Sequence, residues 1–130
     1  VQASVLASKT ASIQHFIYLS VAQPAPVMRA YQSVRARGEA LIKESGIPAT
    51  FVRPWYVLGP GHRWPILLKP FYWIAEKIPK TRETAERLGL VTLEQVLATL
   101  LNAVENPPNF QDSPRVLETV QIRQSESESP

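Results

Sequence analysis

Residues 31–61 contain a helix pattern, a tight turn and an apolar strand in succession, and no other stretch restricts the possible folds as strongly. From residue 27 onward, small and apolar residues recur at the i, i+3, i+4, i+7 spacing of a helix with one apolar face. They are Val27, Ala30, Tyr31, Val34, Gly38, Leu41 and Ser45. Gly46 and Pro48 end this helix. The apolar run 49–53, closed by a proline, predicts a strand that is covered on both faces.

A second strand is predicted upstream, at 15–20 (HFIYLS), because a continuous β-rich apolar run is typical of a buried parallel strand. Only one crossover helix fits between the two strands, so we expect them to be parallel neighbours with a right-handed connection. Gly38 lies in the apolar stripe of that helix, where the lack of a side chain would let the helix approach the sheet closely. The sequence therefore predicts an α/β fold.

The rest of the sequence predicts further elements around this β-α-β unit. These are a helix at 1–13, a turn at 59–61, a short polar helix at 81–88, a helix at 93–104 and a last strand at 115–122. The helix at 93–104 has the strongest signal, because Thr92 and Gln95 form a capping box at its start. Residues 64–78 are crowded with aromatic side chains and interrupted by two prolines. Residues 124–130 predict a disordered polar tail.

Charge and composition argue against several classes of function. The net charge of +3 is mild and the basic residues are scattered, which argues against a nucleic-acid partner. No apolar run reaches the roughly 18 residues that a membrane span needs. The chain has no cysteine and no signal-peptide pattern, so we expect a cytoplasmic protein without a metal site. It also has no initiating Met, and we expect it to begin inside a longer protein.

Five short motifs follow one another along the chain. They are Tyr31-x-x-x-Arg35, Gly38-Glu39, Ser45-Gly46-Ile47-Pro48, Arg53-Pro54 and the segment 57–61 (VLGPG). In this order and with these gaps, the chain resembles the extended and atypical short-chain dehydrogenase/reductases, a family that includes NAD(P)-dependent sugar epimerases and dehydratases and the NmrA-like regulators. The chain departs from the family at Arg35, where the family has its catalytic lysine. The resemblance covers about residues 1–122 and corresponds to the later half of such a fold.

The resemblance implies catalytic roles for three residues. Tyr31 takes the place of the general acid/base, Arg35 that of the lysine that tunes the tyrosine and holds the nicotinamide ribose, and Ser20 that of the residue that orients the substrate oxygen. The chemistry is consistent with these roles, because a tyrosine has an ordinary pKa near 10 and a cation one helical turn away favours its phenolate. Arginine supplies that charge permanently, with a fork of donors larger than the lysine ammonium.

The resemblance also implies which segments border the ligands. The family's segment after the second strand passes the nicotinamide, so Pro54, Trp55, Tyr56 and Val57 are expected to contact the cofactor. His62 and Arg63 follow a glycine-proline-glycine turn and are candidates for substrate contact. The aromatic segment 64–78 would form the roof of the cleft, within a cap at 62–90. Packing of this segment in the core or in a protein interface is the alternative.

The glycine-rich turn that holds a dinucleotide's pyrophosphate is missing, because the five glycines do not form such a motif. The acidic residue that binds the adenosine ribose is missing too. We therefore expect 1–123 to be the C-terminal part of a doubly wound Rossmann-like parallel sheet with a small helical cap. NAD or NADP would then bind only in the full-length protein. The strand at 15–20 would lack one parallel neighbour and expose an apolar edge, which favours self-association.

Three other residues are expected to have structural roles only. His15 stands at the start of the first strand. Glu39 and Lys43 have the i, i+4 spacing of a favourable ion pair, which we expect on the helix surface.

Three hypotheses about function remain open at this point. The first is an NAD(P)-dependent oxidoreductase or sugar-nucleotide epimerase or dehydratase acting on a small molecule, for which Tyr31 is the evidence. The second is a non-catalytic NAD(P)H-binding sensor or assembly factor on the same fold, which Arg35 favours. The third is a protein-binding module without a cofactor, in which the segment 64–78 is the interface.

Overall fold

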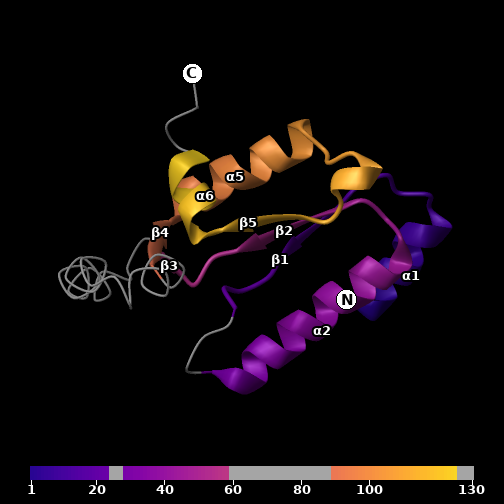
Figure 1. Cartoon of the computed structure of the whole chain (residues 1–130), viewed down its shortest axis with the longest axis horizontal. Helices are drawn as coiled ribbons and strands as arrows, with labels where there is room; N and C mark the ends of the chain where they lie inside the picture. Colours follow the sequence, from indigo (N-terminus) through magenta and orange to yellow (C-terminus); the bar gives the residue numbers. More distant parts are fainter. Residues whose placement is uncertain (24–27, 59–88, 126–130) are drawn as a thin grey trace.

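The computed structural model describes residues 1–23, 28–58 and 89–125, and its helices and strands alternate along the chain (Figure 1). In order they are α1 (Gln2–Thr10), β1 (Phe16–Leu19), α2 (Arg29–Ser45), β2 (Ala49–Arg53), β3 (Tyr56–Leu58), β4 (Leu90–Thr92), α5 (Leu93–Glu105), the 3-10 turn η2 (Phe110–Asp112), β5 (Arg115–Glu118) and α6 (Thr119–Gln124). Two predictions, the strand at 15–20 and the helix between the two strands, are confirmed as β1 and α2.

A parallel sheet of three strands in the order β1-β2-β5 forms the centre of the fold. Phe16 pairs with Ala49, and Thr50 pairs with Arg115, so that β2 is hydrogen-bonded on both sides. The predicted parallel pairing of β1 with β2 is confirmed. Strands β3 and β4 pair in parallel as a second, two-stranded sheet.

Helices cover both faces of the three-stranded sheet, with α1 and α2 on one side and α5 and α6 on the other (Figure 1). The core has a cluster on each face. One consists of Val5, Tyr18, Ile42, Ala49 and Phe51, and the other of Val52, Val91, Val96 and Ile122. Because side chains alternate along a strand, Phe51 and Val52 enter opposite clusters, and both are fully buried. The predictions of an α/β fold and of a strand covered on both faces are confirmed.

The buried face of α2 is not the apolar stripe that its sequence predicts. The helix buries Gln32, Gly38, Glu39 and Ile42, whereas Val34 of the stripe is 68% exposed. The prediction that Glu39 lies on the helix surface is wrong, since this residue is only 3% exposed. The physical reason is that an arginine on β2 pairs with the Glu39 carboxylate, as described below.

The C-terminal segment also differs from its predicted structure. The helix at 93–104 is confirmed as α5, with both hydrogen bonds of the predicted capping box in place. The last strand, however, ends at Glu118 and continues directly into α6, because Glu118 caps that helix together with Gln121. Gln124 belongs to α6 and not to a tail.

Several predictions concern parts of the chain outside the described residues. These are the turn at 59–61, the substrate candidates His62 and Arg63, the aromatic segment 64–78, the helix at 81–88 and most of the tail. No helix in the described part of the chain is long and apolar enough to cross a membrane.

Gly38 is the point of closest approach between α2 and β1. A Cβ atom built on Gly38 would lie 2.5 Å from the Tyr18 hydroxyl oxygen and 2.9 Å from the ring carbon that carries it. Tyr18 is only 8% exposed and its ring meets Phe51 edge to face, with 6.3 Å between the ring centroids. The predicted role of Gly38 in close helix–sheet contact is therefore confirmed.

We predict that Gly38→Ala lowers the free energy of unfolding by about 1 kcal/mol, because overpacking costs of about 1–3 kcal/mol outweigh the gain of about 1 kcal/mol in helix propensity. Urea denaturation measures the change. The reverse substitution at an exposed site of the same helix, Ala40→Gly, reports propensity alone and should cost about 1 kcal/mol. Stabilisation by Gly38→Ala would contradict the predicted clash, and Tyr18→Phe should relieve part of its cost.

We also predict a pH dependence that originates at His15. Its Nε2 lies 2.9 Å from Thr50 Oγ1, and burial, followed by the charge of Arg115, lowers the pKa of His15 below 6.5. The unfolded chain then binds a proton more readily than the folded chain, so stability should be full above pH 6.5 and fall as the pH drops below it. Denaturation curves between pH 5 and 8 should show this loss, and His15→Gln should remove it. An unchanged pH profile in the variant would contradict the assignment.

Candidate functional site

The carboxyl end of β1 holds the predicted tyrosine–arginine pair. Arg35 Nε donates a hydrogen bond to the Tyr31 hydroxyl at 3.2 Å, and one of its terminal nitrogens donates to the Leu19 carbonyl at 3.3 Å. The guanidinium carbon lies 5.2 Å from the ring centroid of Tyr31 and 5.8 Å from that of Tyr18. One turn of α2 therefore positions both residues at the last residue of β1.

Hydroxyl groups on two sides stabilise the charge of Arg35. The Tyr18 and Tyr31 hydroxyls, in that order of importance, raise the pKa of Arg35 above its already high ordinary value. Arg35 is therefore a permanent cation beside the Tyr31 oxygen. Tyr31 itself is 42% exposed.

Ser20, the third predicted catalytic residue, directly follows the carbonyl that Arg35 contacts. Its N–H donates to the Val52 carbonyl at 2.8 Å, which continues the pairing of the two strands beyond β1. The side chain is 5% exposed, and its hydroxyl has no hydrogen-bond partner among the described residues. A buried hydroxyl without a partner is rare, because it has lost its hydration without compensation.

The segment that is expected to contact the cofactor, residues 54–57, begins next to Ser20 and continues into a strand. The Pro54 carbonyl accepts a hydrogen bond from the Ala22 N–H at 3.1 Å, so the segments after β1 and β2 run side by side. Pro54 is buried and Trp55 is half-buried. Tyr56 and Val57 belong to strand β3.

Val57 packs against the core cluster on the α5 face, so its side chain has a structural role as well. The structure thus brings Arg35, Tyr31 and Ser20 to one edge of the sheet, with Pro54 beside Ser20. His62 and Arg63 lie outside the described residues, and no statement about the substrate side of the site rests on them.

A charged cluster at the same edge of the sheet was missed by the sequence prediction. Arg53, the last residue of β2, donates from Nε to Glu39 Oε1 at 2.9 Å and from a terminal nitrogen to Glu118 Oε1 at 2.9 Å. Gln23 also donates to Glu39 Oε1, at 3.3 Å. The side chains of Glu39, Arg53 and Glu118 are 5%, 17% and 30% exposed, so the Glu39–Arg53 pair is the best shielded from water.

The hydrogen bonds from Arg53 to Glu39 are the main reason that the pKa of Arg53 is raised, with burial acting in the opposite direction and Glu118 adding a smaller effect. The signal was present in the sequence, because a charged residue that closes an apolar strand requires a partner when it is buried. Glu39, however, has Lys43 at i+4, and this local pairing suggested a different partner. In the structure, neither ion pair among the described residues involves Lys43.

No three His, Asp or Glu side chains in the described ranges lie close enough together to hold a metal ion. No protein-family model matches the chain, and no curated protein matches it.

We predict that Glu39→Gln lowers the free energy of unfolding by about 2–3 kcal/mol. Removing one partner of a buried ion pair costs about 3–5 kcal/mol, and Glu118 remains to compensate part of the Arg53 charge. Glu44→Gln on the exposed side of the same helix is the matched control and should change stability by less than about 0.5 kcal/mol. Urea denaturation compares the two variants.

A double variant tests whether the cost arises from the unpaired arginine. Replacing Arg53 by Met in the Glu39→Gln background should recover part of the lost stability, because no buried cation is then left without its main partner. Strictly additive losses would contradict this explanation.

Proposed function

We propose that this chain is the C-terminal part of an NAD(P)-binding, Rossmann-like protein of the short-chain dehydrogenase/reductase type, either an oxidoreductase or a sugar-nucleotide epimerase or dehydratase. Tyr31 is the general acid/base for a small-molecule substrate, Arg35 stabilises the charge on its oxygen, and Ser20 orients the reacting oxygen of the substrate. The nicotinamide, when bound, supplies the hydride chemistry.

The position of Arg35 is the observation that carries this proposal. A tyrosine needs a neighbouring cation to exchange protons near neutral pH, and Arg35 donates directly to the Tyr31 hydroxyl. The same guanidinium contacts the Leu19 carbonyl, so the pair stands at the carboxyl end of a parallel strand. Open α/β sheets bind their ligands at the carboxyl ends of their strands. The partnerless hydroxyl of Ser20 at the same edge supports a polar ligand there.

The position of β1 as the outermost strand favours the hypothesis that the sheet is larger in the full-length protein. Strand β1 lies at the edge of the three-stranded sheet, and its last residue, Leu19, is 44% exposed. We propose that an upstream strand pairs with β1 to complete a doubly wound sheet, and that the glycine-rich pyrophosphate site lies there. Without that strand, the unpaired backbone groups of β1 favour self-association of the chain. We also propose a cytoplasmic location.

A non-catalytic NAD(P)H sensor or assembly factor is the second candidate, and the contacts of Arg35 favour it. Two of its three nitrogens already donate to the protein itself, to Tyr31 and to Leu19. A lysine ammonium in this position would reorient more freely toward a ribose. In the third candidate, a module that binds a protein without a cofactor, neither contact has a catalytic purpose.

We predict that the full-length protein binds NADH or NADPH in calorimetric titrations, and that Tyr31→Phe strongly reduces hydride transfer but weakens cofactor binding less than tenfold. Loss of a general acid/base typically reduces turnover by about 10²–10⁴-fold. Ser33→Ala, at an exposed position of the same helix, is the control and should leave turnover unchanged. The 130-residue chain alone should bind neither cofactor at submicromolar concentration, because it lacks the pyrophosphate site.

The outcomes separate the three candidates. If the protein binds the cofactor but shows no turnover, even as an Arg35→Lys variant, the enzyme candidate is excluded and the non-catalytic sensor or assembly factor remains. Absence of cofactor binding by the full-length protein would leave the cofactor-free module. Submicromolar binding by the 130-residue chain would overturn the assignment of this chain as one half of the binding site.

A further inference from the structure

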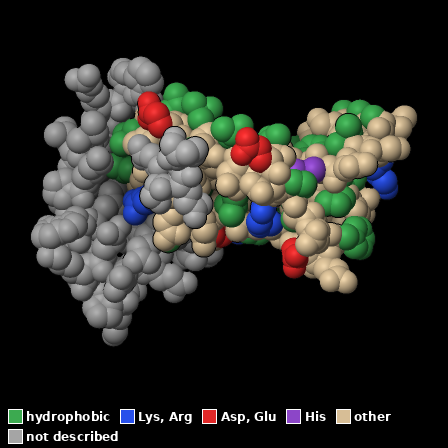
Figure 2. Space-filling model, turned by 90° about the horizontal axis from the view of Figure 1, so that it is seen from above, with side chains coloured by type: hydrophobic (Ala, Val, Ile, Leu, Met, Phe, Trp, Pro, Cys, Tyr) green, Lys and Arg blue, Asp and Glu red, His purple; other side chains and the backbone are tan. Residues whose placement is uncertain are grey.

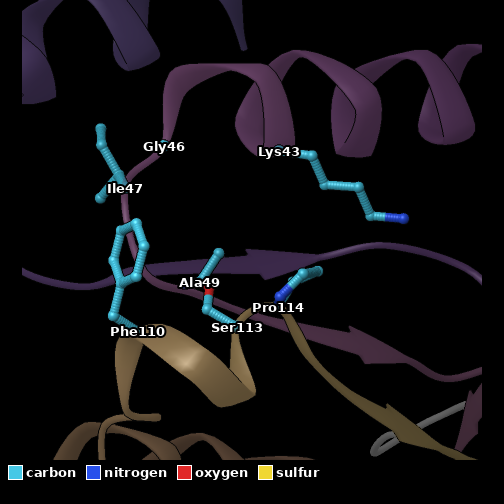
Figure 3. Close-up of a pocket in the computed structure, with 7 residues that line it drawn as sticks. All are labelled: Lys43, Gly46, Ile47, Ala49, Phe110, Ser113 and Pro114. Carbon is cyan, nitrogen blue, oxygen red and sulfur yellow. Dashed lines mark hydrogen bonds between the residues drawn. The ribbon is translucent and has the colours of Figure 1, made fainter.

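A cavity of about 160 Å³ lies at the opposite end of the sheet from Tyr31 and Arg35. It is formed where α2 ends, where β2 begins at Ala49 and where the chain passes from η2 into β5 (Figure 3). In a parallel sheet the amino ends of all strands share one edge, so this cavity and the candidate functional site are separated by the length of the strands. An inference about the cavity is therefore independent of the proposed function.

The walls of the cavity are mostly apolar. Ile47, Ala49, Phe110 and Pro114 line it, and Figure 3 shows the Phe110 ring below Ile47, with Ala49 beside it. Phe110 is 75% exposed, which leaves most of its ring in contact with water. Covering such a ring stabilises a complex, because apolar surface leaves water. One part of an occupant is therefore apolar.

A cation without a counterion stands at the other end of the cavity. Figure 3 shows Lys43 extending from the last turns of α2 along the side that faces Pro114. Its ammonium lies 5.8 Å from the ring centroid of the buried Phe51, and the Lys43 side chain has no ion pair and no hydrogen bond among the described residues. No Asp or Glu lines the cavity, and Glu39, its expected partner, is held by Arg53. The second part of an occupant is therefore anionic.

The negative end of the α2 dipole opposes an anion here, but it is the weaker influence. A helix C-terminus corresponds to about −0.5 charge, carried by its unsatisfied carbonyls. Two of the last carbonyls are already used, since that of Ile42 accepts from the Ser45 hydroxyl and that of Lys43 accepts from the Gly46 N–H. Among the described residues that line the cavity, Lys43 carries the one charged side chain.

Ser113 adds a hydrogen-bond donor to the lining. Its Oγ accepts a hydrogen bond from the Ala49 N–H at 2.9 Å, which fixes the hydroxyl beside Ala49. A serine hydroxyl that accepts one bond still has its own proton to donate. No acceptor for that proton occurs among the described residues. Ser113 therefore supplies one donor in the cavity, and Lys43 supplies a second one on the side of Pro114 (Figure 3).

We propose that this cavity binds a small free carboxylate with a compact apolar body, such as an aromatic or branched-chain acid. An engineered apolar cavity of roughly 150 Å³ binds benzene, so a volume of about 160 Å³ is enough for one aromatic ring or a branched alkyl group. The apolar body lies against Ile47 and Phe110, and the carboxylate lies toward Lys43 and Ser113. For a ligand of this size, a dissociation constant on the order of 1 mM is expected.

Phenylacetate and its uncharged analogue phenylacetamide provide a matched pair of probes. We predict that phenylacetate causes saturable amide shifts at Gly46, Ile47 and Ser113 in a ¹⁵N-labelled sample of the chain, with none at Tyr31. Lys43→Met keeps the aliphatic stem and should weaken phenylacetate binding at least fivefold, without changing that of phenylacetamide. Phe110→Ala should weaken both. Lys9→Met on α1 removes an exposed cation elsewhere and should have no effect.

Each other outcome would overturn the proposal. No saturation at these amides by about 20 mM, ten times the concentration at which a 2 mM complex is half-formed, would mean that the cavity binds no such acid. Equal affinity for phenylacetamide, or an unchanged affinity in Lys43→Met, would identify an apolar anchor site and not an anion site. The spectra of the variants show directly whether each remains folded. If the chain self-associates, the same titration in the full-length protein gives the same readout.

Discussion

The partly buried guanidinium of Arg53 is the constraint to which much of the structure is adjusted. A charge at the end of a fully buried strand is stable only with a partner, and Arg53 receives carboxylates from two other elements, Glu39 of α2 and Glu118 at the end of β5. These contacts set the rotation of α2, which turns Glu39 inward and leaves Val34 exposed to solvent. They also join helix α2 to strands β2 and β5. Arg53 and Glu118, which end these two strands, are 65 residues apart in sequence.

The same rotation of α2 determines which of its side chains lie at each end of the sheet. At the carboxyl end, the first turns of the helix present Tyr31 and Arg35 beside Leu19. At the amino end, Glu39 no longer pairs with Lys43, whose ammonium is left beside a cavity with apolar walls. Gly38 lies between them and sets the distance from helix to sheet through Tyr18. One helix thus links two candidate sites through its orientation alone.

The other side of the molecule carries apolar surface that the fold leaves uncovered. Of the apolar stripe of α5, Val96 enters the core, whereas Leu97, Leu101 and Val104 are more than half exposed. Figure 2 looks onto this side and shows hydrophobic side chains between acidic ones. Together with the unpaired edge of β1, this surface means that hydrophobic burial within the described residues is incomplete.

The sequence by itself determined the elements whose signals are local. A residue spacing of three and four, a glycine stop and a capping box depend only on neighbours along the chain, so α2, β1, β2 and α5 could be predicted, as could the tyrosine–arginine contact across one helical turn.

Only the tertiary structure decided which partner Glu39 takes, because Lys43 is near in sequence but Arg53 is near in space. It also decided that 115–122 divides into β5 and α6, that Tyr56–Leu58 pairs with β4, and that Lys43 and the exposed Phe110 line one cavity. Pairings between distant segments leave no periodic pattern in either segment, since their free energy arises only when the two surfaces meet.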